Sequence, residues 1–231
     1  MFEIERCIDY MIAAELISNV VPVLKQDDTC LQALNWMELF RVSHLPMVQG
    51  KTYLGLVADE LIYSHGDLND KLGVLQVPVE GTFVYENNHI YDVIGLVSSH
   101  QLSVVAVLDR KNNFVGSVMA MDILRTLDTL LCAEQPGGII VLEINRVDYS
   151  MAEIAQIVEY NEVRILSCYL SCPPASQQVK LTLKVNTLSI DPLLDTFIRY
   201  GYTIKNSFVT GQEELDSLRE RYGLLMKYLS M

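Results

Sequence analysis

The first half of the chain contains the same pattern of elements twice, roughly 60 residues apart, and such a repeat is the first thing to look for in a sequence. In residues 29–61, and again in residues 89–124, an apolar helical pattern is followed by a short strand, a turn, a second strand that opens with glycine, and a closing helix. One unit of this kind cannot bury its own apolar face, so it must stack on its twin. The repeat therefore predicts two similar α/β units that share a core.

Short polar segments separate the elements of each copy. An extended segment precedes the helical pattern, at residues 21–24 in the first copy and 81–84 in the second. The two later strands are joined by a polar turn, at residues 49–50 and 111–113. The predicted order in each copy is therefore β-α-β-β-α.

Two pairs of residues have the spacing of a capping box, which marks the start of a helix. Thr29 and Gln32 stand three residues apart in the first copy, and Ser150 and Glu153 do so in the second half of the chain. In a capping box the hydroxyl accepts a hydrogen bond from the backbone amide three residues on, and the longer side chain accepts one from the cap amide. We expect a helix to begin directly after Thr29 and after Ser150.

The duplicated order and spacing resemble the cystathionine β-synthase (CBS) domain, a β-α-β-β-α unit that occurs in tandem pairs. The resemblance is carried by residues 43–48 and 55–57 in the first copy and by residues 106–109 and 116–122 in the second. It implies a fold of the α+β or α/β class that is built from two tandem CBS domains. It also implies a ligand, because pairs of this family typically bind adenine nucleotides in clefts between the two units.

The diagnostic string of the family is Gly, two apolar residues, Thr or Ser, two variable residues and then Asp. The hydroxyl reaches phosphate or ribose, and the carboxylate accepts hydrogen bonds from both ribose hydroxyls. In the second copy Asp122 holds the Asp position, while Met119 replaces the hydroxyl residue. Asp122 is therefore either a ribose contact or a solvent-facing N-cap of the closing helix, where Asp is common.

The first copy departs further from the string. Ala58 stands where the hydroxyl residue should be, and Leu61 stands where the Asp should be. Asp59 or Glu60 can substitute for the missing acid if the helix starts early. The resemblance thus implies one partly retained site and one that depends on where this helix begins.

Matching the two copies to the family gives a set of candidate ligand-binding positions. Three of them face phosphate just before the second strand, and six provide apolar walls and backbone groups for adenine. No Arg stands at the phosphate-facing positions, so a triphosphate lacks the bidentate clamp that binds it best, and a monophosphate or adenosine fits better. With the two acids included, the candidates are Pro22, Val23, Ser43, His44, Leu45, Asp59, Thr82, Phe83, Ser103, Val105 and Asp122.

A run of helix breakers at residues 133–138 predicts a boundary, after which the order β-α-β-β-α-β begins. Residues 139–144 are nearly all apolar, as in a central strand covered on both faces. Residues 179–185 alternate between apolar and polar, which predicts a strand with one wet face. A helix is expected from Asp191 as cap and Pro192 as first residue. We expect three of its apolar residues to face inward, namely Leu194, Phe197 and Ile198.

This second half resembles the ACT domain, a ferredoxin-like βαββαβ regulatory unit that often binds amino acids where two copies meet. The family's ligand loop usually carries a glycine, but residues 145–150 contain none, and a side chain at the close-approach position would push the ligand away. We therefore expect a structural or dimer-forming ACT-like unit. A CBS pair followed by such a unit resembles bacterial regulators of the acetoin-utilisation protein B type, although domain order does not identify a pathway.

These inferences divide the chain into five parts. The expected parts are an N-terminal helix at 1–16, CBS domains at 17–72 and 73–132, an ACT-like domain at 133–209 and a C-terminal helix at 210–231. The last helix is suggested by leucines and a tyrosine at spacings of three and four.

Composition excludes several functional classes. The net charge of −12 argues against nucleic-acid binding, which needs clustered Lys and Arg. No apolar run approaches the roughly 20 residues that span a bilayer, so we expect a cytoplasmic protein without a membrane partner. The four histidines stand in no catalytic or metal-binding motif, and the cysteines lack CxxC spacing. We therefore expect no enzyme, no metal and no cofactor.

Two hypotheses remain for the function. In the first, the protein is a regulator that senses an adenine nucleotide, of the AMP, ADP, ATP or S-adenosylmethionine class, and transmits the signal through a dimer to an unknown protein partner. In the second, the ligand clefts are empty and the chain is a constitutive dimeric interaction module. A homodimer is expected in both, through an apolar helix face that includes Val93, Leu96 and Val97.

Overall fold

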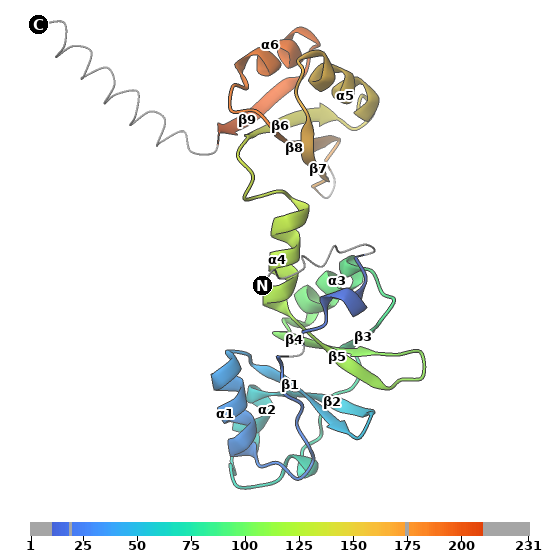
Figure 1. Ribbon diagram of the computed structural model, residues 1–231, viewed down its shortest axis with the longest axis vertical. Coiled ribbons are helices and arrows are strands. Elements are labelled where there is room, and N and C mark those ends of the chain that lie inside the picture. Colours follow the sequence, from blue (N-terminus) through green and yellow to red (C-terminus); the bar gives the residue numbers. More distant parts are fainter. Residues whose placement is uncertain (1–10, 19, 174–175, 210–231) are drawn as a thin grey trace, which may run out of the picture. The chain divides into compact units, whose positions relative to one another are not determined.

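A computed structural model describes residues 11–18, 20–173 and 176–209 (Figure 1). The helix expected at 210–231, and most of the one expected at 1–16, lie outside the described residues. The chain divides into two compact units, Met1–Thr126 and Leu127–Met231. The division falls inside a helix, a few residues before the boundary expected from the breaker run.

The first unit contains the two copies of the repeat, of which the second has the full predicted order β-α-β-β-α and the first has α-β-β-α. Its elements are η1 (Ala13–Leu16), α1 (Cys30–Phe40), β1 (His44–Gln49), β2 (Thr52–Ala58), α2 (Asp59–His65), η2 (Leu72–Val74), β3 (Phe83–Tyr85), α3 (Ile90–His100), β4 (Val104–Leu108), β5 (Phe114–Met119) and α4 (Ala120–Leu130).

The two hairpins, β1–β2 and β4–β5, are antiparallel and share a shift of register. The register shifts between Met47 and Val48 in the first copy and between Val107 and Leu108 in the second. A bulge at the same place in both hairpins shows that the repeat extends to the backbone geometry.

The first strand differs between the copies. In the second copy β3 pairs with β4 in parallel over three residues. In the first copy only Leu24 pairs, through a single parallel bridge with Met47. Pro22 has no amide hydrogen to donate to a strand ladder. The extended segment expected at residues 21–24 is therefore one bridge instead of a strand.

The glycine of each hairpin lies inside the second strand instead of opening it, because another segment crosses the strand there. Gly55 has φ +136°, and a Cβ on it would lie 2.7 Å from the Pro78 carbonyl oxygen. A Cβ on Gly116 would meet the Ile17 side chain. Ile17 and Pro78 occupy the segments that lead into the first and second copies. Each entering segment thus crosses the hairpin of the other copy, and glycine leaves room for it.

An aromatic cluster joins the two copies into one core, as the repeat predicts. Tyr53 on β2 lies 6.1 Å from Phe83 and 6.4 Å from Phe114, measured between ring centroids. Its hydroxyl lies 2.8 Å from the Thr82 hydroxyl oxygen. Thr82 in turn donates to the Val79 carbonyl at 2.6 Å, so Tyr53 is the donor to Thr82. Tyr53 and Thr82 are both buried.

The second unit has the predicted β-α-β-β-α-β order. Its strands form one antiparallel sheet in the order β7-β8-β6-β9, and α5 and α6 lie side by side on one face of it (Figure 1). The elements are β6 (Gly138–Asn145), α5 (Met151–Tyr160), β7 (Ile165–Ser171), β8 (Gln178–Val185), α6 (Asp191–Arg199) and β9 (Thr203–Val209).

Three expectations about burial are wrong, two of them because both helices of the second unit cover the same face of its sheet. Central strand β6 is buried only on alternate residues, and Ile139 and Val141 are half-buried on its other face. On α6, Phe197 is fully buried but Ile198 is 59% exposed instead of facing inward. In the first unit, Val93 on α3 is fully buried, so it cannot belong to the apolar dimer face expected there.

The helix starts expected after Thr29 and Ser150 are confirmed, but only one capping box is complete. Asp191 is not the cap of its helix, because α6 begins at Asp191 itself and its N-cap is Ile190. The Thr29 hydroxyl accepts from the Gln32 amide at 3.2 Å, and the Gln32 side chain accepts from the Thr29 amide at 2.8 Å. The Ser150 hydroxyl accepts from the Glu153 amide at 3.3 Å. The Glu153 carboxylate instead accepts a hydrogen bond from the Tyr202 hydroxyl at 2.6 Å. The second unit therefore uses this acid for a tertiary contact.

Within the described part of the chain, no helix is both long enough and apolar enough to cross a bilayer.

Candidate functional site

A cleft of about 520 Å³ opens in the first unit and is lined by residues of both copies. The first copy contributes the start of β1, the end of β2 and the first turns of α2, and the second copy contributes the end of α3. We call it the inter-repeat cleft. Its lining residues are Ser43, His44, Ala58, Asp59, Glu60, Tyr63, His100 and Gln101.

The early start of α2 places two acids in this cleft. The helix begins at Asp59, and its N-cap, Ala58, has no side chain that could cap it. The Asp59 carboxylate instead accepts from the Glu60 amide at 2.8 Å, and the Asp59 amide donates to the Ser43 carbonyl at 3.0 Å. The condition under which Asp59 or Glu60 can replace the missing acid of the family string is therefore met.

His44 connects the two copies at the floor of the cleft. Its Nδ1 lies 3.0 Å from the Ser43 hydroxyl and 3.1 Å from the Ser103 hydroxyl. The Ser103 amide donates to the same nitrogen at 3.3 Å, which makes Nδ1 an acceptor. Burial lowers the pKa of His44 below its ordinary value, against the opposing effect of Asp59 and Glu60. The imidazole is therefore neutral at pH 7.

Four of the six polar candidates, Ser43, His44, Asp59 and Ser103, thus come together. The first three line the inter-repeat cleft, and Ser103 supports it through hydrogen bonds to Ser43 and His44. The Ser43 amide donates to the Ser103 hydroxyl at 3.0 Å, so the two serines that precede the equivalent hairpins contact one another.

Asp122 lies elsewhere, in the first turn of α4. It is the third residue of this helix, not its N-cap, so the capping interpretation is wrong. One carboxylate oxygen pairs with the Arg125 guanidinium at 3.0 Å. The other oxygen is buried and has no hydrogen-bond partner among the described residues. A buried carboxylate oxygen without a donor needs an explanation, and a ligand or water hydroxyl would provide one.

The residues expected to form apolar walls are not among those that line the inter-repeat cleft. Leu45 and Val105 have no exposed surface and pack in the core. Thr82 uses its hydroxyl within the protein, as described above, and the Phe83 ring packs on Tyr53. Thr82 and Phe83 thus contact Tyr53 of the first copy and help to join the two copies. Pro22 and Val23 do not line the inter-repeat cleft, although Val23 is exposed.

Three cleft residues were missed by the sequence analysis. Tyr63 lies four residues after Asp59, hence on the same face of α2, and this spacing could have identified it. His100 and Gln101 end α3, and Gln101 adopts a left-handed conformation with φ +53°. Arg41, at the end of α1, does the same with φ +54°. The repeat therefore shows that the two helix ends are equivalent. It does not show which of them lines the inter-repeat cleft.

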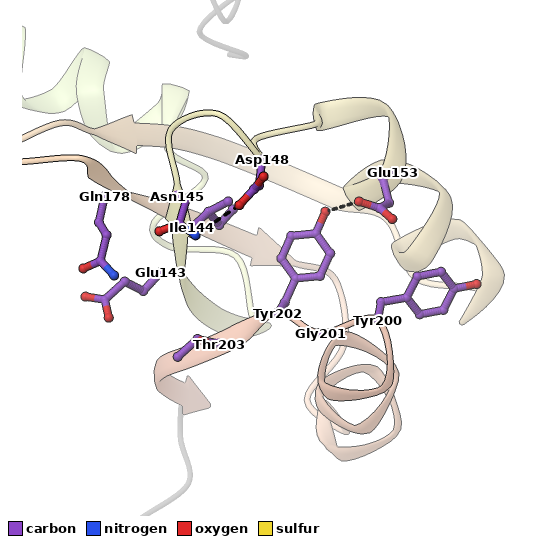
Figure 2. Close-up of a pocket in the computed structure, with 10 residues that line it drawn as sticks. All are labelled: Glu143, Ile144, Asn145, Asp148, Glu153, Gln178, Tyr200, Gly201, Tyr202 and Thr203. Atoms are coloured by element: carbon purple, nitrogen blue, oxygen red, sulfur yellow. Dashed lines mark hydrogen bonds between the residues drawn. The ribbon is translucent and has the colours of Figure 1, made fainter.

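A second hollow, of about 340 Å³, lies in the second unit beside the β6–α5 loop (Figure 2). It is lined by three carboxylates, and Figure 2 shows Tyr202 and Glu153 pointing toward one another. Each carboxylate already has a partner, namely Tyr202 for Glu153 at 2.6 Å, Asn145 for Asp148 at 3.0 Å and Lys205 for Glu143 at 3.7 Å. These pairs give the carboxylates a structural role.

No protein-family model matches the chain. Solved structures that match about half of it are CBS domain pairs. A CBS domain pair/ACT domain protein from Thermotoga maritima is 21% identical, with a TM-score of 0.46, over 51% of this chain and 96% of that one. CBSX2, solved in complex with AMP, is 16% identical, with a TM-score of 0.44, over 51% and 96%. The CBS domains of a transcriptional regulator from Streptococcus pneumoniae are 17% identical, with a TM-score of 0.44, over 51% and 99%.

Proposed function

We propose that residues 17–132 form a CBS domain pair that senses an adenine nucleotide or a related adenosyl compound, and that the protein is a non-catalytic regulator. The candidate ligands are AMP, ADP, ATP and S-adenosylmethionine. One observation carries the proposal: Asp59 lies in a cleft with Ser43 and His44 of its own copy and with His100 and Gln101 of the other.

The groups in the cleft match the parts of a nucleoside. A carboxylate such as that of Asp59 can accept hydrogen bonds from both ribose hydroxyls. The Tyr63 ring offers an apolar face on which a base can stack. Hydroxyl, imidazole and amide groups of Ser43, His100 and Gln101 supply orienting polar contacts. A cleft of about 520 Å³ lies within the usual range for small-ligand sites, roughly 300–1,000 Å³.

Regulation would follow from the position of the cleft between the copies. A ligand that contacts Asp59 in one copy and Gln101 in the other binds best to one arrangement of the two. Such differential affinity is what shifts a population between conformations. We further propose that the second unit is an ACT-like domain, that the protein is a cytoplasmic homodimer, and that the dimer passes the signal to a protein partner.

The alternative is a constitutive interaction module whose clefts stay empty. Ala58 and Leu61 in the first copy, and Met119 in the second, depart from the ligand-binding string and favour this alternative. Two features favour the sensor, namely the acids of the inter-repeat cleft and the buried oxygen of Asp122, which finds no hydrogen-bond partner in the part of the chain that the structure describes.

Isothermal titration of the purified full chain with AMP, ADP, ATP and S-adenosylmethionine tests the proposal. Asp59→Ala should abolish binding at the inter-repeat cleft, whereas Asp122→Ala tests the ribose position of the second copy. Asp67→Asn serves as the control, because it removes an exposed acid in the loop after α2, outside the cleft. Absence of heat with all four compounds, from a folded protein, would reject the sensor in favour of the interaction module.

A further inference from the structure

The inter-repeat cleft has a negative lining. Asp59 and Glu60 both face it, and none of its described lining residues is Lys or Arg. A cation close by is Arg41, which lines an adjoining hollow that shares Asp59 and Tyr63. A phosphate group in the cleft would therefore face two carboxylates without a guanidinium or ammonium among the lining residues.

Neither His44 nor helix α2 offsets this charge. His44 accepts a hydrogen bond at Nδ1 from the Ser103 amide, so a second proton would break that contact. Helix α2 has only seven residues, and both of its first-turn acids already stand at its N-terminus. The favourable interaction between a helix N-terminus and negative charge is thus used within the protein.

We propose that the inter-repeat cleft binds adenine compounds that carry no phosphate, and prefers those with a cationic group in the phosphate position, over AMP, ADP and ATP. The inference rests on the proposed function, because it takes an adenine compound as the ligand. The ribose and base contacts at Asp59 and Tyr63 stay the same for all these compounds. Only the group attached to the ribose distinguishes them, and that group meets the field of Asp59 and Glu60.

The size of the preference follows from Coulomb's law. The Coulomb energy of two unit charges about 4 Å apart in water changes a dissociation constant roughly fivefold. The dianionic phosphate of AMP faces two carboxylates, and salt screens part of this repulsion. We expect adenosine to bind about tenfold more tightly than AMP, and S-adenosylmethionine at least as tightly as adenosine.

The experiment titrates the full chain with adenosine, AMP, ATP and S-adenosylmethionine, in about 0.05 M and about 1 M NaCl. The ratio of AMP to adenosine dissociation constants should fall toward one at high salt. It should also fall in Asp59→Asn/Glu60→Gln and, by a smaller factor, in Glu60→Gln alone. Asp67→Asn removes one acid outside the cleft and should leave the ratio unchanged. Trp36 fluorescence shows that each variant is folded.

The outcomes separate this inference from the proposed function. If AMP or ATP binds as tightly as adenosine or more tightly, the charge selection is wrong while the sensor stands. Loss of that tight binding in Arg41→Ala would then assign the phosphate to Arg41. If none of the four compounds binds, the proposed function fails and this inference fails with it.

Discussion

Replacing Thr82 by valine distinguishes a structural role of this residue from the ligand contact that the sequence suggested. The Thr82 hydroxyl accepts from Tyr53 at 2.8 Å and donates to the Val79 carbonyl at 2.6 Å. Valine has nearly the same shape but makes neither hydrogen bond. Tyr53 is 7% exposed, so its hydroxyl would be left in a nearly dry environment with only a marginal 3.5 Å contact to the Thr82 carbonyl.

The Thr82→Val substitution removes two hydrogen bonds from the first unit. At about 1 kcal/mol each, the free energy of unfolding of the first unit should fall by about 2 kcal/mol. With a urea m-value of about 2 kcal/mol/M, the midpoint should move down by about 1 M. Trp36 is the chain's single tryptophan and lies on α1, so its fluorescence follows the first unit specifically. Thr52→Val on β2, at an exposed position, is the matched control and should change the midpoint little.

Two results would refute this reasoning. A Thr82→Val midpoint equal to that of the native protein would mean that the hydrogen bonds to Tyr53 and Val79 contribute nothing. Loss of adenosine or AMP binding at unchanged stability would return Thr82 to the ligand-binding role. The structure predicts the opposite combination, lower stability with unchanged affinity in the folded protein.

Three further changes probe other features. The burial-lowered pKa of His44 means that the unfolded chain takes up a proton before the folded one, so the stability of the first unit should fall as pH drops below 6.5. His44→Gln should reduce this dependence in urea titrations at about pH 7.5 and about pH 5. Gly116→Ala should destabilise the first unit by about 1–3 kcal/mol, and Ile17→Ala in the same chain should restore part of the loss, as urea midpoints will show. Tyr202→Phe should lower the stability of the second unit by about 1 kcal/mol, measured by circular dichroism in urea.

The features that sequence predicted well depend on neighbouring residues along the chain. Thr29 and Gln32 form both bonds of their capping box because only one helical turn separates them. The alternation in residues 179–185 predicted the buried face of β8, since successive side chains of a strand point to opposite faces. The expectation that the other face is wet is wrong at Lys184, which is buried and donates to the Ala133 carbonyl at 2.9 Å. The repeat itself predicted the order of the helices and the hairpin strands in both copies.

The features that sequence misjudged depend on which element covers which face. The apolar run of β6 suggested burial on both faces, but α5 and α6 both pack on one, and Ile139 is left half-buried on the other. For the same reason a periodic pattern could not decide between Phe197 and Ile198 as the inward residue of α6. Apolar composition sets how much surface can be buried, whereas the path of the chain sets where.

The acid that lines the candidate site could not be predicted from the sequence of either copy alone. Asp59 and Ala120 occupy equivalent positions, because the amide of each donates to the serine carbonyl that precedes the hairpin of its copy, at 3.0 Å. A string search compares each copy with a family pattern and therefore selects Asp122, whose copy matches best. The inter-repeat cleft is instead lined by Asp59, from the copy that departs further from the string, together with Gln101 from the other copy. The two acids thus stand at positions that are not equivalent in the repeat, since Asp122 corresponds to Leu61, and only the three-dimensional pairing of the copies shows that Asp59 lines the cleft.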